Sequence, residues 1–152
     1  ASTLAAHRAA LEAQIARDGA RPSVIAWSLA NEPGYLGEEE ARRPAARNYW
    51  RELYAAARAL DPTRPLTHAH VAHAGDDDPA FEFDDFLSLN RYYGWYQAPG
   101  QLDEAERLLR EDIRRLSERY GKPVLLTEFG ADAVPGMHAT DDQLFTEEYQ
   151  SA

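Results

Sequence analysis

The sequence contains no cysteine, which excludes disulfide frameworks and thiolate chemistry. It has no apolar run near the roughly 20 residues that a helix needs to cross a bilayer, so we expect no membrane partner. Basic residues are in the minority, because 16 Lys and Arg stand against 26 Asp and Glu, for a formal net charge of -10. A chain without a basic face offers little to a phosphate backbone, and we expect no nucleic-acid partner.

What is present is typical of a globular domain. The chain has 152 residues, of which 44% are hydrophobic and 11% aromatic, enough for one domain with a core. We therefore interpret residues 1–152 as a single domain. Residues 1–20 carry acidic side chains and no continuous apolar core, so they do not look like a secretory signal peptide, which favours a cytoplasmic location.

Apolar periodicity predicts strands that alternate with helices. Helical spacing covers residues 4–18, 44–60, 102–120 and 141–152, and apolar or β-branched runs that predict strands cover 24–29, 66–71, 83–89 and 124–127. Alternation without a linker indicates parallel βα units of an α/β protein. About four strands are visible where a TIM (β/α)8 barrel has eight, so we predict part of such a barrel. A doubly wound sheet stays open as an alternative, although no glycine-rich phosphate turn follows any strand.

Two of the predicted strands end in a carboxylate. Glu32 follows the strand 24–29, and Glu128 follows the strand 124–127. The C-terminal ends of barrel strands form the catalytic face. A pair of carboxylates on that face suggests glycoside hydrolysis, which uses one as the acid and the other as the nucleophile. Read singly, either acid could instead be a structural group that pairs with an arginine.

Four motifs, spread over nearly the whole chain, carry a family resemblance. They are Trp27–Pro33, Leu60–Pro65, Leu89–Tyr96 and Thr127–Asp132. With them the sequence resembles glycoside hydrolase family 2 and, within it, the β-glucuronidases; the later run 136–138 points the same way. The resemblance implies that residues 1–152 are part of the catalytic barrel domain and cover roughly strands four to seven.

The resemblance also implies roles for the two acids. Glu32 would be the general acid/base, and Glu128 the nucleophile of a retaining hydrolase that cleaves terminal β-D-glucuronosides through a covalent glycosyl-enzyme. In such enzymes the two carboxyl groups lie about 5 to 5.5 Å apart, so one can attack the anomeric carbon while the other protonates the leaving oxygen. No metal or organic cofactor is implied.

Further positions match substrate-binding residues of the family. They are Asn31, Asn90, Tyr92 and Tyr96. The resemblance implies that Asn31 binds the sugar 2-hydroxyl and that Tyr92 touches the nucleophile. It further implies that the full-length protein is a homo-oligomer.

Two alternatives to this first interpretation remain open. The family's Asn-x-Lys motif, which reads the glucuronate carboxylate, is absent from the sequence, so a β-galactosidase or another neutral-sugar hydrolase of family 2 is the second reading. The third is an inactive truncated fragment or a sugar-binding pseudoenzyme. His68, His70 and His73 suggest a metal, but no carboxylate or cysteine stands at ligand spacing, and we predict none.

Overall fold

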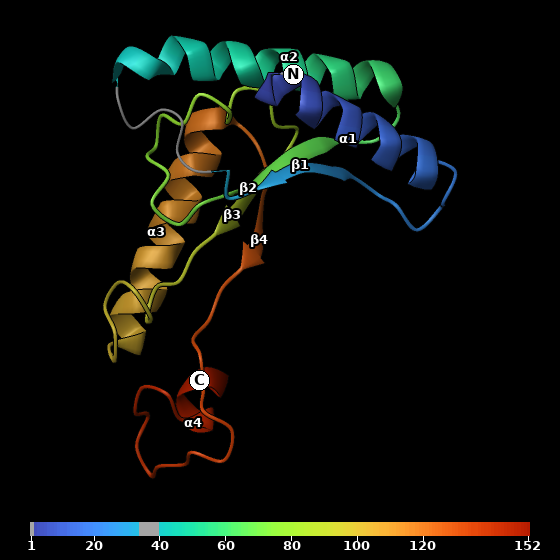
Figure 1. Cartoon of the computed structure of the whole chain (residues 1–152). Coiled ribbons are helices and arrows are strands. Elements are labelled where there is room, and N and C mark those ends of the chain that lie inside the picture. The colour runs from blue at the N-terminus through green and yellow to red at the C-terminus, as the bar shows by residue number, and fades with distance from the viewer. Residues whose placement is uncertain (1, 34–39) are drawn as a thin grey trace. The chain divides into compact units, whose positions relative to one another are not determined.

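The computed structural model describes residues 2–33 and 40–152 and shows strands that alternate with helices (Figure 1). Its elements are α1 (Thr3–Asp18), β1 (Trp27–Asn31), η1 (Glu40–Arg42), α2 (Arg43–Leu60), β2 (Leu66–His70), β3 (Leu87–Asn90), α3 (Leu102–Tyr120), β4 (Val124–Glu128) and α4 (Glu147–Ser151). The strands follow one another in the sheet in the order β1-β2-β3-β4. The chain divides into two compact units, Ala1–Ser88 and Leu89–Ala152, and β3 carries the boundary.

The first unit places two helices on a pair of parallel strands. β1 pairs with β2, and an irregularity in the register lies between Ser28 and Asn31. α1 and α2 contact each other and lie on the same side of these strands (Figure 1). The core between them consists of Leu11, Ile15, Trp27, Leu29, Trp50, Leu53, Tyr54, Ala57, Leu66 and Ala80.

The second unit joins β4 to the end of β3 and carries α3. The backbone N–H of Arg91 donates to the carbonyl of Glu128 at 2.9 Å, which ties the chain after β3 to the tip of β4. α3 turns Ala105, Asp112 and Leu116 inward. It ends at Gly121, whose φ of 64° is the left-handed conformation that glycine adopts at low cost.

The first strand begins later than the predicted range 24–29. Pairing starts where the N–H of Trp27 donates to the carbonyl of Pro65 at 3.0 Å. Upstream of that point the partner chain is a turn, and the carbonyl of Val24 accepts from Arg64 Nε at 2.7 Å instead. The prediction was wrong for residues 24–26 because apolar character alone does not supply a neighbouring strand.

The third strand was predicted at residues 83–89 and is shorter, since β3 begins at Leu87. Residues 80–83 form a turn closed by the Phe83 N–H, which donates to the carbonyl of Ala80 at 2.9 Å. The turn delivers the buried side chain of Asp84 to hydrogen-bond partners on other elements. A side-chain network therefore decides the conformation here, against the local strand pattern.

The predicted helix over residues 141–152 is wrong in its first half. α4 covers only Glu147–Ser151, and Thr146 caps it by accepting the Tyr149 N–H at 3.1 Å. Phe145, just before the cap, has a left-handed φ of 72°, which a helix cannot contain. Within residues 2–33 and 40–152, no helix combines the length and apolar character that crossing a membrane requires.

Candidate active site

The end of β1 holds the first candidate acid in an unusual backbone conformation. Asn31 is the exposed last residue of the strand, and the Glu32 N–H donates to the carbonyl of Ala69 at 2.9 Å. Glu32 has a φ of 42°, in the left-handed region that side-chain-bearing residues seldom occupy. Such conformations cost about 1–3 kcal/mol and concentrate at functional sites. The end of β1 therefore holds Glu32 in a backbone conformation that costs free energy.

The end of β4 holds the second candidate acid against a tyrosine. Glu128 is the last residue of β4, and its half-buried carboxylate accepts a hydrogen bond from the Tyr92 hydroxyl. Tyr92 follows β3 by two residues, so the contact joins the tips of two adjacent strands. A hydroxyl donor stabilises negative charge on the carboxylate, which is the form that a nucleophile needs.

Two more predicted positions lie beside this pair. Tyr96 is 72% exposed, and its ring packs edge-on against Tyr92, with centroids 5.5 Å apart. Asn90 is fully buried, and its Oδ1 accepts from the Thr127 hydroxyl at 2.7 Å. The second unit therefore brings Asn90, Tyr92, Tyr96 and Glu128 together, whereas Asn31 and Glu32 belong to the first unit.

A buried ion pair supports the Tyr92 segment and was missed in the sequence. Arg91 Nε donates to Asp112 Oδ2 at 2.6 Å, and the two side chains are only 4% and 5% exposed. Arg115 also donates to Asp112, at 2.5 Å. The signal was available, because Asp112 occupies the apolar stripe of α3, three residues after Leu109 and four before Leu116. An acid at such a position calls for a buried cation.

The histidines of β2 meet a carboxylate that sequence spacing did not reveal. His68, His70 and Asp84 form the one group of potential metal ligands found within the described part of the chain. Their atoms are already engaged: His70 Nε2 bonds Asp84 at 2.7 Å, and His70 Nδ1 bonds Asp78 at 3.1 Å. The Tyr54 hydroxyl donates to Asp84 and lies 3.0 Å from His68 Nδ1. We therefore assign the cluster a structural role.

His70 makes stability depend on pH. Burial lowers the pKa of His70, but the carboxylates of Asp78 and Asp84 outweigh it and raise the pKa overall above 6.5. A histidine whose pKa is higher in the folded than in the unfolded state stabilises the folded protein. This stabilisation is complete below the pKa of the unfolded state and is lost as pH rises through the pKa of the folded state. We expect the free energy of unfolding to fall in that window, by at most about 1.4 kcal/mol per pH unit for one proton.

Urea unfolding of the full-length protein and of His70→Gln, followed from about pH 5.5 to 9, checks this expectation. The difference between the two proteins should be largest in acid and shrink above pH 7. Burial lowers the pKa of His68, so the pH dependence of its contribution is opposite to that of His70. The folded protein holds His68 neutral, and the stability that this provides is lost as pH falls. The charge of His70 also lowers the pKa of His68, so the same comparison is repeated in a His68→Gln background. An equal pH slope in the two members of each pair would contradict the assignment to His70.

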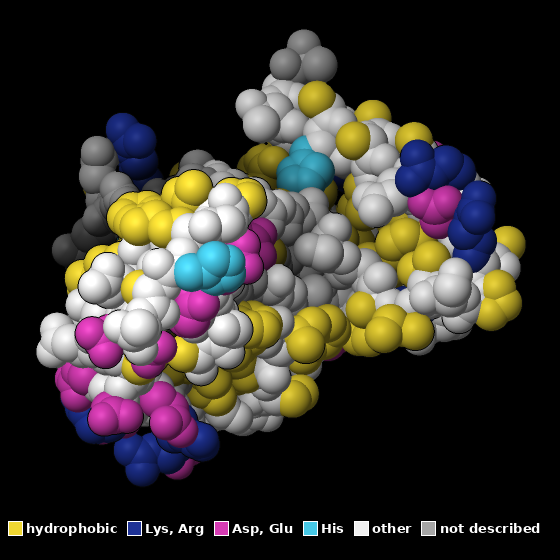
Figure 2. Space-filling view, turned by 90° about the horizontal axis from the view of Figure 1, so that it is seen from below, with side chains coloured by type: hydrophobic (Ala, Val, Ile, Leu, Met, Phe, Trp, Pro, Cys, Tyr) yellow, Lys and Arg dark blue, Asp and Glu magenta, His cyan; other side chains and the backbone are white. Residues whose placement is uncertain are grey.

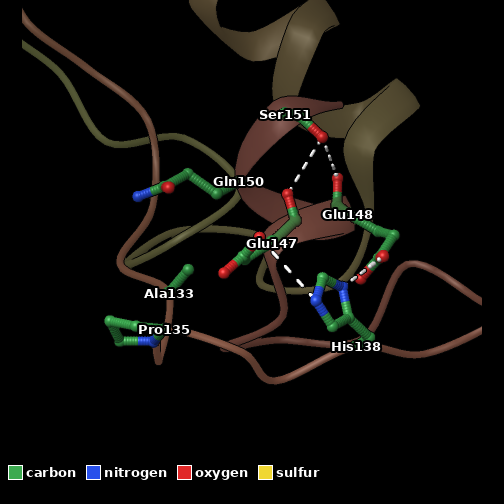
Figure 3. Close-up of a pocket in the computed structure, with 7 residues that line it drawn as sticks. All are labelled: Ala133, Pro135, His138, Glu147, Glu148, Gln150 and Ser151. Carbon is green, nitrogen blue, oxygen red and sulfur yellow. Dashed lines mark hydrogen bonds and ion pairs between the residues drawn. The ribbon is translucent and has the colours of Figure 1, made fainter.

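A surface pocket of about 490 Å³ lies between α4 and the loop after β4 (Figure 3). His138 faces the two acids of α4, with Nδ1 2.8 Å from Glu148 Oε1, and this carboxylate raises the pKa of His138. Glu147 accepts from the Gly136 N–H at 2.8 Å, and Glu148 from the Ala139 N–H at 3.2 Å. Both acids thus hold the loop to α4, and we assign the pocket no ligand.

Comparison with known proteins shows the family to which the chain belongs. Residues 1–152 match the family described as glycosyl hydrolases family 2, TIM barrel domain, and the chain belongs to that family. The predicted family and the partial (β/α) barrel are confirmed. Which four of the eight barrel strands are present stays a prediction.

The particular relatives are β-glucuronidases. That of Paenibacillus borealis is 43% identical over 97% of this chain and 24% of its own, and that of Mus musculus is 36% identical over 96% and 22%. Among solved structures, the β-glucuronidase of an uncultured Clostridium sp. has a TM-score of 0.87 at 38% identity, over 97% of this chain and 25% of that one. The Ruminococcus gnavus β-glucuronidase in complex with D-glucuronic acid has a TM-score of 0.83 at 39% identity, with the same coverage. The chain thus spans about a quarter of the length of these relatives.

Proposed function

We propose that the full-length protein hydrolyses terminal β-D-glucuronosides with retention of configuration. The observation that carries this proposal is the carboxylate of Glu128 at the tip of β4, held by the Tyr92 hydroxyl in a chain of family 2. Relatives that share 32–43% of its residues are named β-glucuronidases, which supports glucuronides over neutral sugars.

The two acids would divide the reaction into two displacements. Glu128 attacks the anomeric carbon as Glu32 gives its proton to the glycosidic oxygen; the bond to the leaving group breaks and an ester to Glu128 forms. Glu32, now a carboxylate, then removes a proton from water, and the water oxygen displaces Glu128 from the same carbon. Two inversions restore the β configuration. The barrel fold supports this division because it brings strand ends to one face.

Smaller roles follow for the remaining predicted residues. Asn31 is exposed at the tip of β1 and is proposed to bind the sugar 2-hydroxyl, a bond that strengthens in the oxocarbenium-like transition state. The hydroxyl of Tyr92 orients Glu128, and the exposed ring of Tyr96 offers the sugar a contact beside it. Asn90, buried and bonded to Thr127, is proposed to complete the floor of the sugar site.

The test compares two substrates on the full-length protein. We expect cleavage of an aryl β-glucuronide and little cleavage of the matching β-galactoside, with Glu128→Gln as the control that removes the activity. Glu128→Gln keeps the size of the side chain and abolishes the nucleophile, so activity that survives in it comes from another source. Preference for the galactoside would overturn the substrate but keep the chemistry. Inertness of the wild type towards both would indicate a binding or inactive protein.

A further inference from the structure

The half-buried imidazole of His7, on α1, is bonded to the backbone of β1. Its Nε2 lies 2.7 Å from the carbonyl oxygen of Leu29, and its Nδ1 lies 2.8 Å from the hydroxyl of Tyr49 on α2. A carbonyl oxygen only accepts hydrogen bonds, so Nε2 carries the hydrogen, and Nδ1 of the neutral ring accepts from the Tyr49 hydroxyl. His7 therefore joins both helices of the first unit to one peptide group of β1.

That peptide group belongs to a bulge in β1. Ser28 is paired with Thr67 and Asn31 with Ala69, so β1 advances by three residues where β2 advances by two. The two residues 29–30 thus share one partner position, which is the arrangement of a β-bulge. A bulge disrupts the ladder locally and bends the strand, so the direction in which the chain leaves β1 depends on it.

Side chains bond the carbonyl groups of both residues in the bulge. His7 donates to the carbonyl of Leu29, and the Ser28 hydroxyl donates to the carbonyl of Ala30 at 3.2 Å. The bond from His7 is the shorter of the two, and it alone comes from another element. The path of the backbone through the bulge is therefore fixed to α1.

Glu32 follows the bulge directly after Asn31. Its φ of 42° is left-handed, and a residue keeps such a conformation only where its surroundings over-determine it. On one side the Glu32 N–H donates to the carbonyl of Ala69 at 2.9 Å. On the other side the backbone reaches Glu32 from the bulge. The conformation of Glu32 thus depends on the bulge, and the bulge on His7.

His7 occupies the apolar stripe of α1. It comes one helical turn before Leu11 and two turns before Ile15, the two buried residues of that helix. Packing against the strands would be served by an apolar side chain at this position as well. The two hydrogen bonds are therefore what the imidazole adds.

We propose that His7 is a positioning residue for Glu32, which it directs by holding the Leu29 carbonyl in the bulge. This inference rests on the proposed function, in which Glu32 gives its proton to the glycosidic oxygen. A general acid works only within hydrogen-bond reach of that oxygen, about 2.6–3.2 Å. A shift of about 1 Å can cost on the order of 10²-fold in rate. Loss of His7 should therefore slow most the substrates that need this proton.

The experiment measures kcat/KM for dinitrophenyl and methyl β-glucuronide. Dinitrophenolate leaves without a proton, whereas the methyl leaving group needs one, so the dinitrophenyl-to-methyl ratio reports on the acid. Hydrophobic side chains reach the surface of residues 1–152 on the face shown in Figure 2, and Leu125 and Phe129 are 51% and 71% exposed. Since exposed apolar surface favours aggregation, the full-length protein is used.

Two amide variants of His7 differ chiefly in reach. The amide nitrogen of asparagine takes the place of Nδ1 and ends short of Leu29, whereas that of glutamine reaches the place of Nε2. We expect the ratio to rise about 10-fold or more in His7→Asn and less than about 3-fold in His7→Gln. Tyr49→Phe removes the hydroxyl that fixes the tautomer and should raise the ratio about 2- to 5-fold. Glu32→Ala is the reference and should raise it most.

Ile15→Ala is the matched control. Ile15 is buried at 7% exposure on the same stripe of α1, and its truncation weakens the packing of that helix without touching the bulge. Ile15→Ala should lower Tm at least as much as His7→Asn does, and should leave the ratio unchanged.

The outcomes separate the two proposals. An unchanged ratio in His7→Asn, or in Tyr49→Phe should His7→Asn not fold, overturns the positioning role. An equal rise in Ile15→Ala or in His7→Gln overturns it too, because packing or the imidazole itself would then explain the effect. Inertness of the wild type towards both glucuronides overturns the proposed function instead, and an unchanged ratio in Glu32→Ala removes Glu32 as its acid.

Discussion

Replacement of Glu128 by alanine is expected to lower the hydrolysis of an aryl β-glucuronide by roughly 10⁴-fold or more, because the first displacement loses its nucleophile. Azide should then restore cleavage of the aryl β-glucuronide, but the product should not be the free glucuronate that the wild type forms. It enters from the face that the carboxylate has left and displaces the aryl group in one step. The product is the α-glucuronyl azide, of inverted configuration, and its anomeric proton in NMR identifies it.

Glu32→Ala is the matched variant, because it removes the other carboxylate. Its loss is expected to be about 10²- to 10⁴-fold, the usual contribution of acid/base catalysis. An aryl leaving group departs without much help, so the ester on Glu128 still forms, and azide attacks it in place of water. This second inversion gives the β-glucuronyl azide. If the two variants yield the opposite azides, the roles of Glu32 and Glu128 are exchanged; if neither yields one, the double displacement is refuted.

Loss of Asp112 is expected to have the largest effect on stability. Asp112→Ala leaves the guanidinium of Arg91 buried without its carboxylate, and breaking a buried pair in this way costs about 3–5 kcal/mol. Since the backbone of Arg91 also bonds Glu128, we expect the Tyr92 hydroxyl to leave the nucleophile and turnover to fall as well. Urea unfolding and kcat of the full-length protein measure the two effects.

α3 supplies a control for this prediction. Glu106 pairs with Arg110 one turn apart on the exposed face, where the side chains are 63% and 76% exposed, and such pairs contribute about 0.3–0.5 kcal/mol. Glu106→Ala should therefore be nearly neutral. The double change Arg91→Met with Asp112→Leu should recover much of the loss, because no charge is left buried. Equal costs for Asp112→Ala and Glu106→Ala would refute the assignment.

The helices were predictable because their periodicity is long. The range 102–120 agrees with α3, and 44–60 differs from α2 by one residue. The apolar side of α2 is the buried one, with Trp50, Leu53 and Tyr54 inward. Over 17 or more residues the apolar stripe outweighs local exceptions, whereas a strand of five residues depends on what lies beside it.

The residue types at the candidate site were predictable from the sequence. The ion pairs and hydrogen bonds that hold neighbouring segments in place were less predictable. The motifs placed Glu128 at a strand tip with Tyr92 beside it, and the structure shows that contact; the catalytic roles stay predictions. The pairs Arg91–Asp112 and His70–Asp84 could not be read from spacing, because 21 and 14 residues separate the partners. Only the folded chain brings such groups within bonding distance.

The irregular register of β1 makes the length of that strand more critical than its composition. Between Ser28 and Asn31 the pairing with β2 advances unevenly, and Asn31 then faces Ala69. In a strand, one residue added or removed turns every later side chain to the opposite face. A deletion at Ala30 would thus rotate Asn31 and Glu32 out of position with all functional groups still present. Along this segment we expect insertions and deletions to abolish activity, whereas many substitutions leave activity unchanged.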